Sequence, residues 1–350
     1  MRITDVQAII LRQPNVDATR ADGSQDALLI RVETDEGITG IGEVDSLPSI
    51  IKAIVDAPPS HSNAMGLRSF RVGENRLETD RLWHKMYRGS IYYGRQSAAI
   101  HAMSGIDIAL WDIKGKALGL PIHTLLGGPH RQEIRAYAST LMPDTPQETA
   151  SVVSGLVERG FSAIKLGWGP LGKDADLDVA LVRAAREAAG DGVDLMFDIG
   201  MGWNSADHAI RQVRRFEPYN PYWVEEPFWP DETAAYRKLA ETVETRIACG
   251  EEDTTHWGFA RLMDETQVDV VQPDVTRAGG ISELVKIAQQ ADLRGVTMVP
   301  HSWSTGIIKA ASLHVIGAMP NASFFEYCVQ ETELNQLLTV QRFPVVDGKV

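Results

Sequence analysis

The spacing of apolar and polar residues changes along this chain, and the change divides it into two regions. From about residue 131 onward, short apolar runs alternate with amphipathic segments whose apolar residues recur every three or four positions. Strands that alternate with helices in this way are typical of a parallel sheet covered by helices. The predicted strands cover residues 133–139, 162–168, 193–200, 221–227, 246–252, 268–274, 296–302 and 323–328.

The first 128 residues have a different pattern. Residues 3–11 and 27–43 read as strands, and the turn sequence at 34–37 divides the second stretch. Residues 75–89 and 95–119 have helical spacing, and Gly127 with Gly128 closes the region.

These patterns predict a domain organisation. We expect an α+β domain over residues 1–128, to which an irregular C-terminal segment (331–350) returns, and a catalytic barrel over 129–330. Two polar, turn-rich segments of the first domain, 13–26 and 46–66, are predicted to be flexible loops.

A charged or ionisable residue stands at the end of seven successive apolar runs. From the third predicted strand onward these residues follow one another at intervals of 23 to 27 positions, about the length of one βα unit. In a closed parallel barrel the C-terminal strand ends converge on one mouth, whereas an open sheet would place its site at a single switch point. Seven contributing strands therefore favour a modified TIM barrel. The residues are Lys165, Asp198, Glu225, Glu251, Asp274, His301 and Glu326.

Asp198, Glu225 and Glu251 end three consecutive predicted strands. An all-carboxylate set favours Mg²⁺ over zinc, because Mg²⁺ prefers oxygen ligands and leaves positions for water or substrate. Carboxylates at strand ends also cap helices, but three in register are poorly explained as caps. Glu226 should point the opposite way from Glu225 and is the weaker ligand candidate.

Asp274 and His301 end the next two strands and form a candidate acid–base pair, since a carboxylate that fixes the tautomer of a histidine raises its basicity. Three carboxylates, a divalent cation and a substrate carboxylate would leave excess negative charge, which Lys165 or protonated His301 can balance. Glu326 could donate a hydrogen bond to a developing oxyanion, provided that a raised pKa keeps it protonated.

Composition excludes several other classes of function. The net charge of −13 and the lack of a basic patch make nucleic acids and anionic membranes unfavourable partners. Two cysteines rule out a disulfide scaffold, no apolar stretch approaches membrane-spanning length, and the N-terminus lacks the features of a signal peptide. We therefore expect a cytoplasmic protein whose partner is neither a nucleic acid nor a membrane.

With these residues in place, the chain resembles the enolase superfamily, and within it the mandelate racemase subgroup. The stretch ALWDIKGKALGLPIHTLLGG before the barrel, the stretch PDVTRAGG starting at Pro273 and the strand SFFEYC carry the resemblance over nearly the whole sequence. The resemblance implies a (β/α)₇β barrel with an N-terminal capping domain, a homo-oligomer, and Mg²⁺ as the cofactor. It assigns the metal ligands to Asp198, Glu225 and Glu251, the general base to Asp274 with His301, and the hydrogen bond to the intermediate to Glu326.

Two positions depart from the pattern of the family. Members often carry Lys-x-Lys on the second barrel strand, where this chain has Lys165 and then Gly167, and Asp-x-Asn on the third, where it has Asp198 and then Gly200. A racemase needs acid–base groups on both faces of the α-carbon, and Gly167 removes one of them. A single histidine can instead take the α-proton and return it to a departing β-hydroxyl, as in acid-sugar dehydratases of carbohydrate catabolism.

We therefore expect a lyase that dehydrates a hydroxy or sugar acid to a 2-keto acid. Alternatively, the enzyme is an isomerase, either a racemase or epimerase or a lactone cycloisomerase, with Lys165 as the second acid–base group. A non-catalytic binding barrel is a further alternative from another class. Five tryptophans that follow strand ends could pack on a sugar or merely on rim loops: Trp168, Trp203, Trp229, Trp257 and Trp303.

Overall fold

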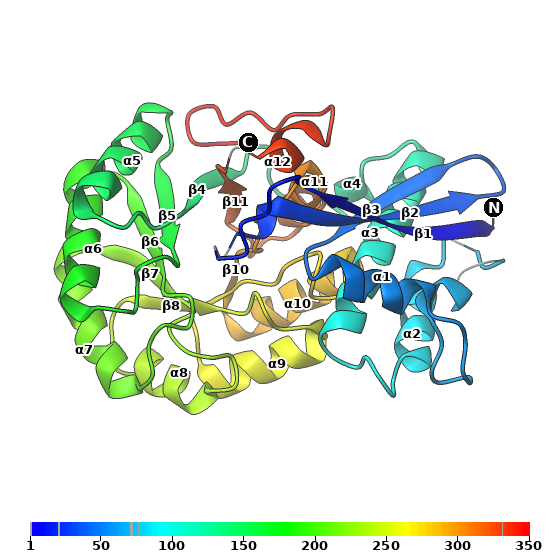
Figure 1. The fold of residues 1–350 in the computed structure, drawn as a ribbon, viewed down its shortest axis with the longest axis horizontal. Coiled ribbons are helices and arrows are strands. Elements are labelled where there is room, and N and C mark those ends of the chain that lie inside the picture. The colour runs from blue at the N-terminus through cyan, green and yellow to red at the C-terminus, as the bar shows by residue number, and fades with distance from the viewer. Residues whose placement is uncertain (1, 20–21, 71–72, 76, 331) are drawn as a thin grey trace.

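The computed structural model describes residues 2–19, 22–70, 73–75, 77–330 and 332–350, and it contains an antiparallel and a parallel sheet (Figure 1). The antiparallel sheet has the order β1-β2-β3, with β1 (Ile3–Arg12), β2 (Asp26–Thr34) and β3 (Thr39–Val44). Gly37, with a φ of 77°, lies in the turn that joins β2 to β3. The turn predicted at residues 34–37 is thus confirmed.

The parallel sheet has eight strands in the order β10-β9-β8-β7-β6-β5-β4-β11. The two ends of this order meet at a parallel bridge between Met298 and Ala322, so the sheet curls into the predicted barrel. The strands are β4 (Arg135–Leu141), β5 (Ala163–Gly167), β6 (Asp194–Asp198), β7 (Pro221–Glu225), β8 (Arg246–Cys249), β9 (Val270–Val271), β10 (Thr297–Met298) and β11 (Phe324–Cys328).

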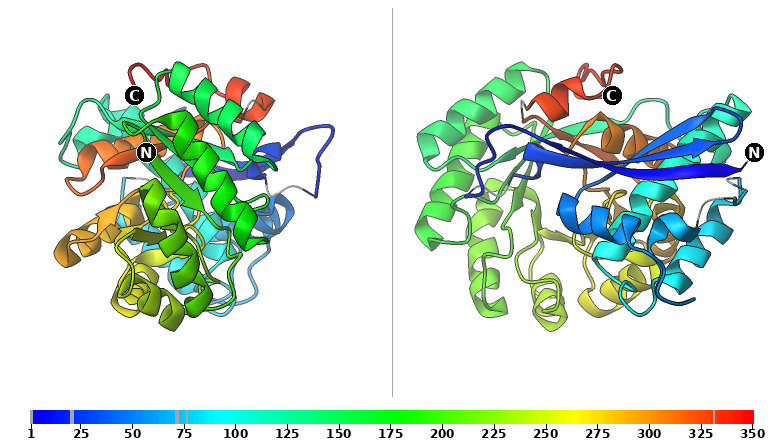
Figure 2. Two further views of the ribbon diagram at one scale, coloured as in Figure 1. Left: turned by 90° about the vertical axis from the view of Figure 1, so that its left-hand side faces the viewer. Right: turned by 45° about the vertical axis from the view of Figure 1, so that its right-hand side comes forward.

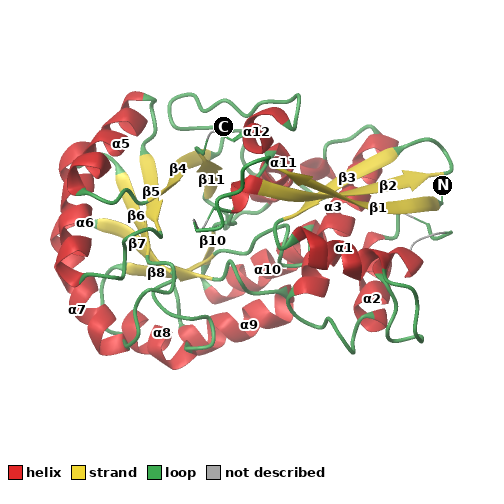
Figure 3. Cartoon of the chain, in the orientation of Figure 1, coloured by secondary structure: helices red, strands yellow, loops and turns green. Residues whose placement is uncertain are grey.

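A helix follows each of the first seven barrel strands, and these helices lie outside the strands (Figure 3). Local sequence sets their ends: Asp174 accepts hydrogen bonds from the amides of Asp176 and Leu177 where α6 begins, and Gly190 follows its last residue. The helices are α5 (Pro146–Glu158), α6 (Ala175–Ala189), α7 (Ala206–Phe216), α8 (Thr233–Ala240), α9 (Thr255–Thr266), α10 (Ile281–Arg294) and α11 (Gly306–Ala318).

The antiparallel sheet of the N-terminal region lies beside the helices of that region (Figure 2), and their buried side chains form a hydrophobic core of their own. A Cβ atom at Gly42 on β3 would lie 1.9 Å from the carbonyl oxygen of Gly105 on α3, so only glycine permits this packing. None of the helices in the described residues is long and apolar enough to cross a membrane. The helices of this region are α1 (Pro48–Asp56), α2 (Thr79–Gly89), α3 (Ala98–Leu118) and α4 (Ile122–Leu125).

The prediction that residues 46–66 form a flexible loop is wrong for its first half, where α1 begins with Pro48 at its first position. Ile51 and Val55 of this helix are fully buried, and that burial stabilises a segment whose polar flanks suggested a loop. Within the other predicted loop, 13–26, Asp22 caps a short 3₁₀ helix, η1 (Gly23–Gln25), and residues 20–21 lie outside the described residues.

The segment that follows β11 contacts both parts of the molecule. Helix α12 (Glu333–Leu337) lies against η1, and the hydroxyl of Thr332 donates to the carbonyl of Ser24 at 3.2 Å. The amide of Ala136 on β4, in contrast, donates to the carbonyl of Gly348 at 2.8 Å. The segment thus contacts the N-terminal region through Thr332 and α12 and the barrel through its last residues, and the expected domain organisation stays a prediction; residue 331 itself is outside the described part.

One side chain from each barrel strand, or from the residue just after it, fills the interior of the barrel. Side chains two positions apart on a strand face the same way, so the next inward-facing residues form a layer nearer the mouth. For seven strands this second layer is polar: Ser139, Lys165, Asp198, Glu225, Gln272, His301 and Glu326. The buried apolar layer consists of Tyr137, Ala163, Met196, Trp223, Ala248, Val270, Val299 and Phe324.

Candidate active site

Three carboxylates meet at the mouth of the barrel. Oxygens of Asp198, Glu225 and Glu251 all lie within 4.8 Å of one another, and all three side chains are buried. Burial and the charge of Glu225 raise the pKa of Asp198 well above its usual range. The structure thus brings the three predicted metal ligands together, as a site whose like charges repel one another.

This donor set fits a hard divalent cation such as Mg²⁺. All three ligands offer oxygen, and Nζ of Lys165 is shared between Glu225 of the cluster and Glu326 outside it. The adjacent Glu226 does not join the set, because its carboxylate accepts from the Tyr236 hydroxyl at 2.5 Å and from the Gly250 amide at 2.6 Å. It faces away from the cluster, as the strand alternation predicted.

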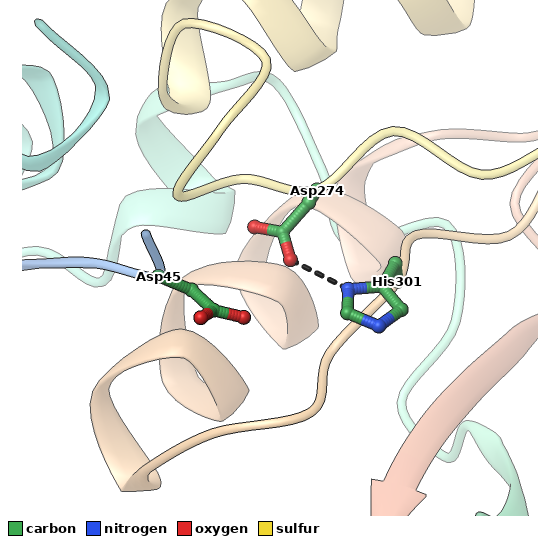
Figure 4. Close-up of side chains that lie close together, drawn as sticks. All are labelled: Asp45, Asp274 and His301. Atoms are coloured by element: carbon green, nitrogen blue, oxygen red, sulfur yellow. Dashed lines mark hydrogen bonds and ion pairs between the residues drawn. The ribbon is translucent and has the colours of Figure 1, made fainter. Parts of the chain in front are cut away.

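The predicted acid–base pair is formed. His301 Nδ1 lies 2.6 Å from Asp274 Oδ2 (Figure 4). The other carboxylate oxygen of Asp274 accepts from the amide and hydroxyl of Thr276, each at 2.6 Å. Asp274 therefore cannot turn away, and its bond to Nδ1 directs Nε2 of His301 to the other side. That nitrogen is 3.3 Å from Glu251 Oε2, at the edge of the carboxylate cluster.

Neighbouring carboxylates control the charge of His301. Burial lowers its pKa, but Glu251, Glu326 and the hydrogen bond to Asp274 outweigh that effect and raise the pKa to about 10. Among these groups Glu251 has the largest raising effect. A cation held by the three carboxylates would offset that charge and make the neutral, basic form of the imidazole accessible near neutral pH.

Lys165 and Glu326 form a second buried pair across the mouth. Lys165 Nζ lies 2.8 Å from Glu326 Oε1, which also accepts from Ser139 Oγ at 2.7 Å, and Glu326 Oε2 accepts from the Ser302 amide at 2.7 Å. Burial lowers the pKa of Lys165, but Glu225 and Glu326 raise it well above its usual value, so this side chain is an ammonium.

A raised pKa, which would keep Glu326 protonated as a hydrogen-bond donor, is not found in this arrangement. Burial raises its pKa, yet Lys165 and His301 outweigh burial and lower the pKa to about 2, so Glu326 is a carboxylate. An ionised Glu326 cannot donate a hydrogen bond to an oxyanion. In this structure the donor beside that position is the ammonium of Lys165, which Glu326 holds in place.

Two residues that sequence reasoning did not single out complete the site. Arg277 Nη2 lies 2.7 Å from Oδ2 of Asp45, which directly follows β3 of the N-terminal region, and Arg277 Nη1 lies 3.6 Å from Glu251. Asp45 also lies beside Asp274 and His301, with carboxylate and ring atoms within 4.8 Å of one another (Figure 4). The available signals were weak: an acidic residue at a strand end, and an arginine three positions after Asp274.

A cavity of about 400 Å³ opens above these side chains. Lys165, Asp198, Glu251 and His301 line its floor, and Asp22 with Gly23 from the loop between β1 and β2 close one side. The N-terminal region and the barrel therefore share the site.

The five tryptophans that follow the predicted strand ends have different surroundings in the structure. Trp168 and Trp303 line the cavity, and the indole nitrogen of Trp303 donates to Asp22 at 3.3 Å. Trp203 is buried, whereas Trp229 and Trp257 are exposed and do not line this cavity. Only Trp168 and Trp303 are placed to contact a small molecule above the carboxylates.

The two glycines that depart from the family pattern are enclosed by neighbouring side chains. A Cβ atom at Gly167 would lie 2.6 Å from Cβ of Asp198, so that a longer side chain could be accommodated only if this candidate ligand moved. Gly200 has a φ of 56°, and a Cβ atom there would lie 2.8 Å from the indole of Trp168. The place of the usual second lysine is thus not an open space in this chain.

Comparison with known proteins agrees with this arrangement. Residues 2–127 match the family described as the mandelate racemase/muconate lactonizing enzyme N-terminal domain, and residues 148–350 match the enolase C-terminal domain-like family.

Individual relatives carry out different reactions. The D-galactarolactone cycloisomerase of Agrobacterium fabrum is 33% identical over 91% of this chain and 83% of its own length, and the D-galactonate dehydratase of Pectobacterium atrosepticum is 32% identical over 92% and 85%. The crystal structure of the 3,6-anhydro-D-galactonate cycloisomerase from Zobellia galactanivorans superposes with a TM-score of 0.90 and 29% identity, covering 100% of this chain and 93% of that one.

Proposed function

Since this chain belongs to the mandelate racemase subgroup of the enolase superfamily, we propose that it removes the proton α to the carboxylate of a hydroxy or sugar acid and then expels the β-hydroxyl, giving a 2-keto acid. The observation that carries this proposal is a single complete His301–Asp274 pair beside the carboxylate cluster, with glycine at position 167. Asp198, Glu225 and Glu251 would hold Mg²⁺, which supplies positive charge to the substrate carboxylate and so acidifies the α-proton.

The proton would move at one atom of the protein. Nε2 of His301 takes the α-proton, and the electrons of the broken C–H bond form a double bond toward the carboxylate carbon. The same Nε2 then returns the proton to the β-hydroxyl as the C–O bond breaks, so that water leaves and the resulting enol tautomerises to a 2-keto acid. Asp274 keeps Nδ1 protonated throughout, because its carboxylate accepts from that nitrogen.

Lys165 and Glu326 would assist without moving the α-proton. The ammonium of Lys165 faces the carboxylate cluster and can stabilise negative charge that develops on the substrate. Glu326 accepts from Lys165, Ser139 and Ser302, so its contribution is to orient the ammonium. This role replaces the donor role that a protonated Glu326 would have had.

A second function is cycloisomerisation of a sugar lactone or an anhydro sugar acid. Two cycloisomerases among the relatives favour it, and the chemistry is again a β-elimination in which the departing oxygen remains tethered to the product. One base also suffices for this reaction. Racemisation is less favoured, because Gly167 stands at the usual place of a second lysine and Lys165 Nζ is already paired with Glu225 and Glu326.

A substrate screen in D₂O tests the proposal. The purified protein with Mg²⁺ should convert at least one member of a panel of aldonic and aldaric acids, their lactones and anhydro acids to a 2-keto acid, detected by its reaction with semicarbazide. Conversion of a lactone without loss of water would favour cycloisomerisation, and deuterium at C2 of recovered acid without elimination would favour racemisation.

The variant that tests the base is His301→Asn. It should lower the rate of conversion of the substrate about 10²-fold to 10⁴-fold, because it removes the base. The control is His84→Asn, which changes an exposed histidine on α2 of the N-terminal region. It should leave the rate unchanged. If His301→Asn retained the wild-type rate, the assignment of the base would be wrong.

A further inference from the structure

Trp168 stands between two cavities at the mouth of the barrel. The cavity above the carboxylates, of about 400 Å³, and a neighbouring cavity of about 900 Å³ are both lined by Thr140, Leu141 and Trp168. The second cavity lies between the loops that follow β4, β5 and β6. A molecule whose carboxylate lies in the first cavity could therefore extend past Trp168 into the second.

The backbone fixes Trp168 in this position. Its φ of 58° is in the left-handed region, which an aromatic residue seldom adopts. One face of the indole packs on Gly200, where an added Cβ atom would lie 2.8 Å from Cδ2 of Trp168 and 2.9 Å from Cε3. The side chain is only partly buried, so the rest of the ring remains available to the cavities as a rigid aromatic surface.

The chemistry of the second cavity suits a carbohydrate. Beside Trp168 the residues that line it include Thr140, Glu148, Lys173 and Gln330, whose side chains carry a hydroxyl, a carboxylate, an amine and an amide. These groups offer both donors and acceptors, as the hydroxyls of a neutral sugar require, and their charges have both signs. Aromatic surface with adaptable polar groups around it can bind the apolar C–H face and the hydroxyls of one ring together.

We infer that the second cavity binds a glycosyl group attached to the acid at the end far from its carboxylate. The substrate class would then include aldobionic acids, which are disaccharides that end in an aldonic acid. This inference rests on the proposed function in one respect: the acid end is taken to bind above Asp198, Glu225 and Glu251.

Equilibrium binding tests the inference independently of turnover. The His301→Asn protein with Mg²⁺ is titrated calorimetrically with gluconic acid and with its glycosylated forms: cellobionic, maltobionic, melibionic and gentiobionic acids. At least one of these aldobionic acids should bind about tenfold more tightly than gluconic acid, a gain typical of one well-placed aromatic contact. Wild-type protein titrated with the same acids and Ca²⁺ in place of Mg²⁺ gives a second measurement that does not depend on this variant.

Val152 on α5 provides a variant that fills the second cavity, which it lines with a side chain that is 37% exposed. Val152→Trp should abolish the preference for the aldobionic acid, and the smaller Val152→Phe should reduce it. Ser151→Trp, at the exposed neighbouring position, is the matched control and should keep the preference.

Two results would overturn the inference: no aldobionic acid binds more tightly than gluconic acid, or the preference survives in Val152→Trp. A protein that dehydrates simple acids but shows no preference would contradict only the second subsite. A protein that prefers an aldobionic acid yet neither dehydrates nor isomerises any acid would contradict only the proposed reaction.

Discussion

Asp198 carries its charge at the centre of a buried cluster of like charges. Burial, Glu225 and Glu251 all raise its pKa, and Lys165 with the Gly200 amide opposes them only in part. A group whose pKa is raised by folding destabilises the folded state at neutral pH, since its ionised form is disfavoured there. The cluster could hold a cation, and without one it lowers the stability of the folded protein.

Replacing Asp198 with asparagine should distinguish the destabilisation that its charge causes in the metal-free protein from its contribution to cation binding. In a chelator, Asp198→Asn should melt higher than the wild type, on the order of 2 °C or more, because one repelling charge is lost. Saturating Mg²⁺ should raise the melting temperature of the wild type by mass action but leave that of the variant unchanged. Asp176→Asn, at an exposed carboxylate paired with Arg215, should behave like the wild type in both conditions. A Mg²⁺-induced rise of equal size in Asp198→Asn would contradict the ligand assignment.

Strand β3 and helix α11 meet at a buried carboxylate. Glu43 on β3 is fully buried; it accepts from Thr305 Oγ1 at 2.6 Å and from the Ile308 amide at 3.0 Å, where α11 begins. An acidic group at a helix N-terminus satisfies unpaired amides and complements the helix dipole. Burial nevertheless dominates and raises the pKa of Glu43 to about 7 from 4.5.

This shift predicts a pH dependence of stability. Between about pH 4.5 and pH 7 the folded chain holds the Glu43 proton more tightly than the unfolded chain, so the free energy of unfolding should fall as the pH rises through that window. Relative to Glu43→Gln, the wild type should lose up to about 3 kcal/mol across the window and nothing further above it. Urea unfolding of both proteins at pH 4 to 8 measures the difference, with the part-exposed Glu33→Gln on β2 as the control. If the free energy of unfolding of the wild type, relative to that of Glu43→Gln, instead rose with pH, the assignment would be contradicted.

Over the whole molecule, the ion pair between Asp45 and Arg277 joins the N-terminal region to the barrel beside the candidate base. The side chains are 11% and 19% exposed, and Arg277 also donates from Nε to the carbonyl of Asp45 at 3.2 Å. Burial lowers the pKa of Arg277, but Asp45 and Asp274 raise it well above its usual value, so the guanidinium stays charged. A charge held this deeply depends on its partners.

Asp45→Asn should therefore destabilise the protein by about 1–3 kcal/mol, since it leaves Arg277 without one of its charged partners. Because the pair fixes the end of β3 against the barrel, amide hydrogen exchange of residues 40–47 should become faster in the variant. Asp264→Asn removes an exposed ion pair with Arg294 and should change the stability by less than about 1 kcal/mol. Unchanged exchange in residues 40–47 of Asp45→Asn would show that the pair does not hold the two regions together.

The sequence by itself determined the barrel and the residues at its mouth. Strand alternation has a period of two and βα units recur at near-constant length, so the ends of consecutive apolar runs had to meet once the sheet closed. The same alternation predicted that the side chain of Glu226 faces away from that of Glu225, as the structure shows. Helix α1 was missed because its buried apolar side chains, Ile51 and Val55 among them, are stabilised by packing that no local pattern reveals.

Only the tertiary structure decided the contacts between residues distant in sequence and the charges that depend on them. It brought Asp45 to Arg277 and placed Lys165 between Glu225 and Glu326, where the ammonium lowers the pKa of Glu326. It also showed that Asp198 and Trp168 fill the space beside Gly167 and Gly200. These outcomes follow from burial and from distances between charges, and both quantities exist only once the chain has folded.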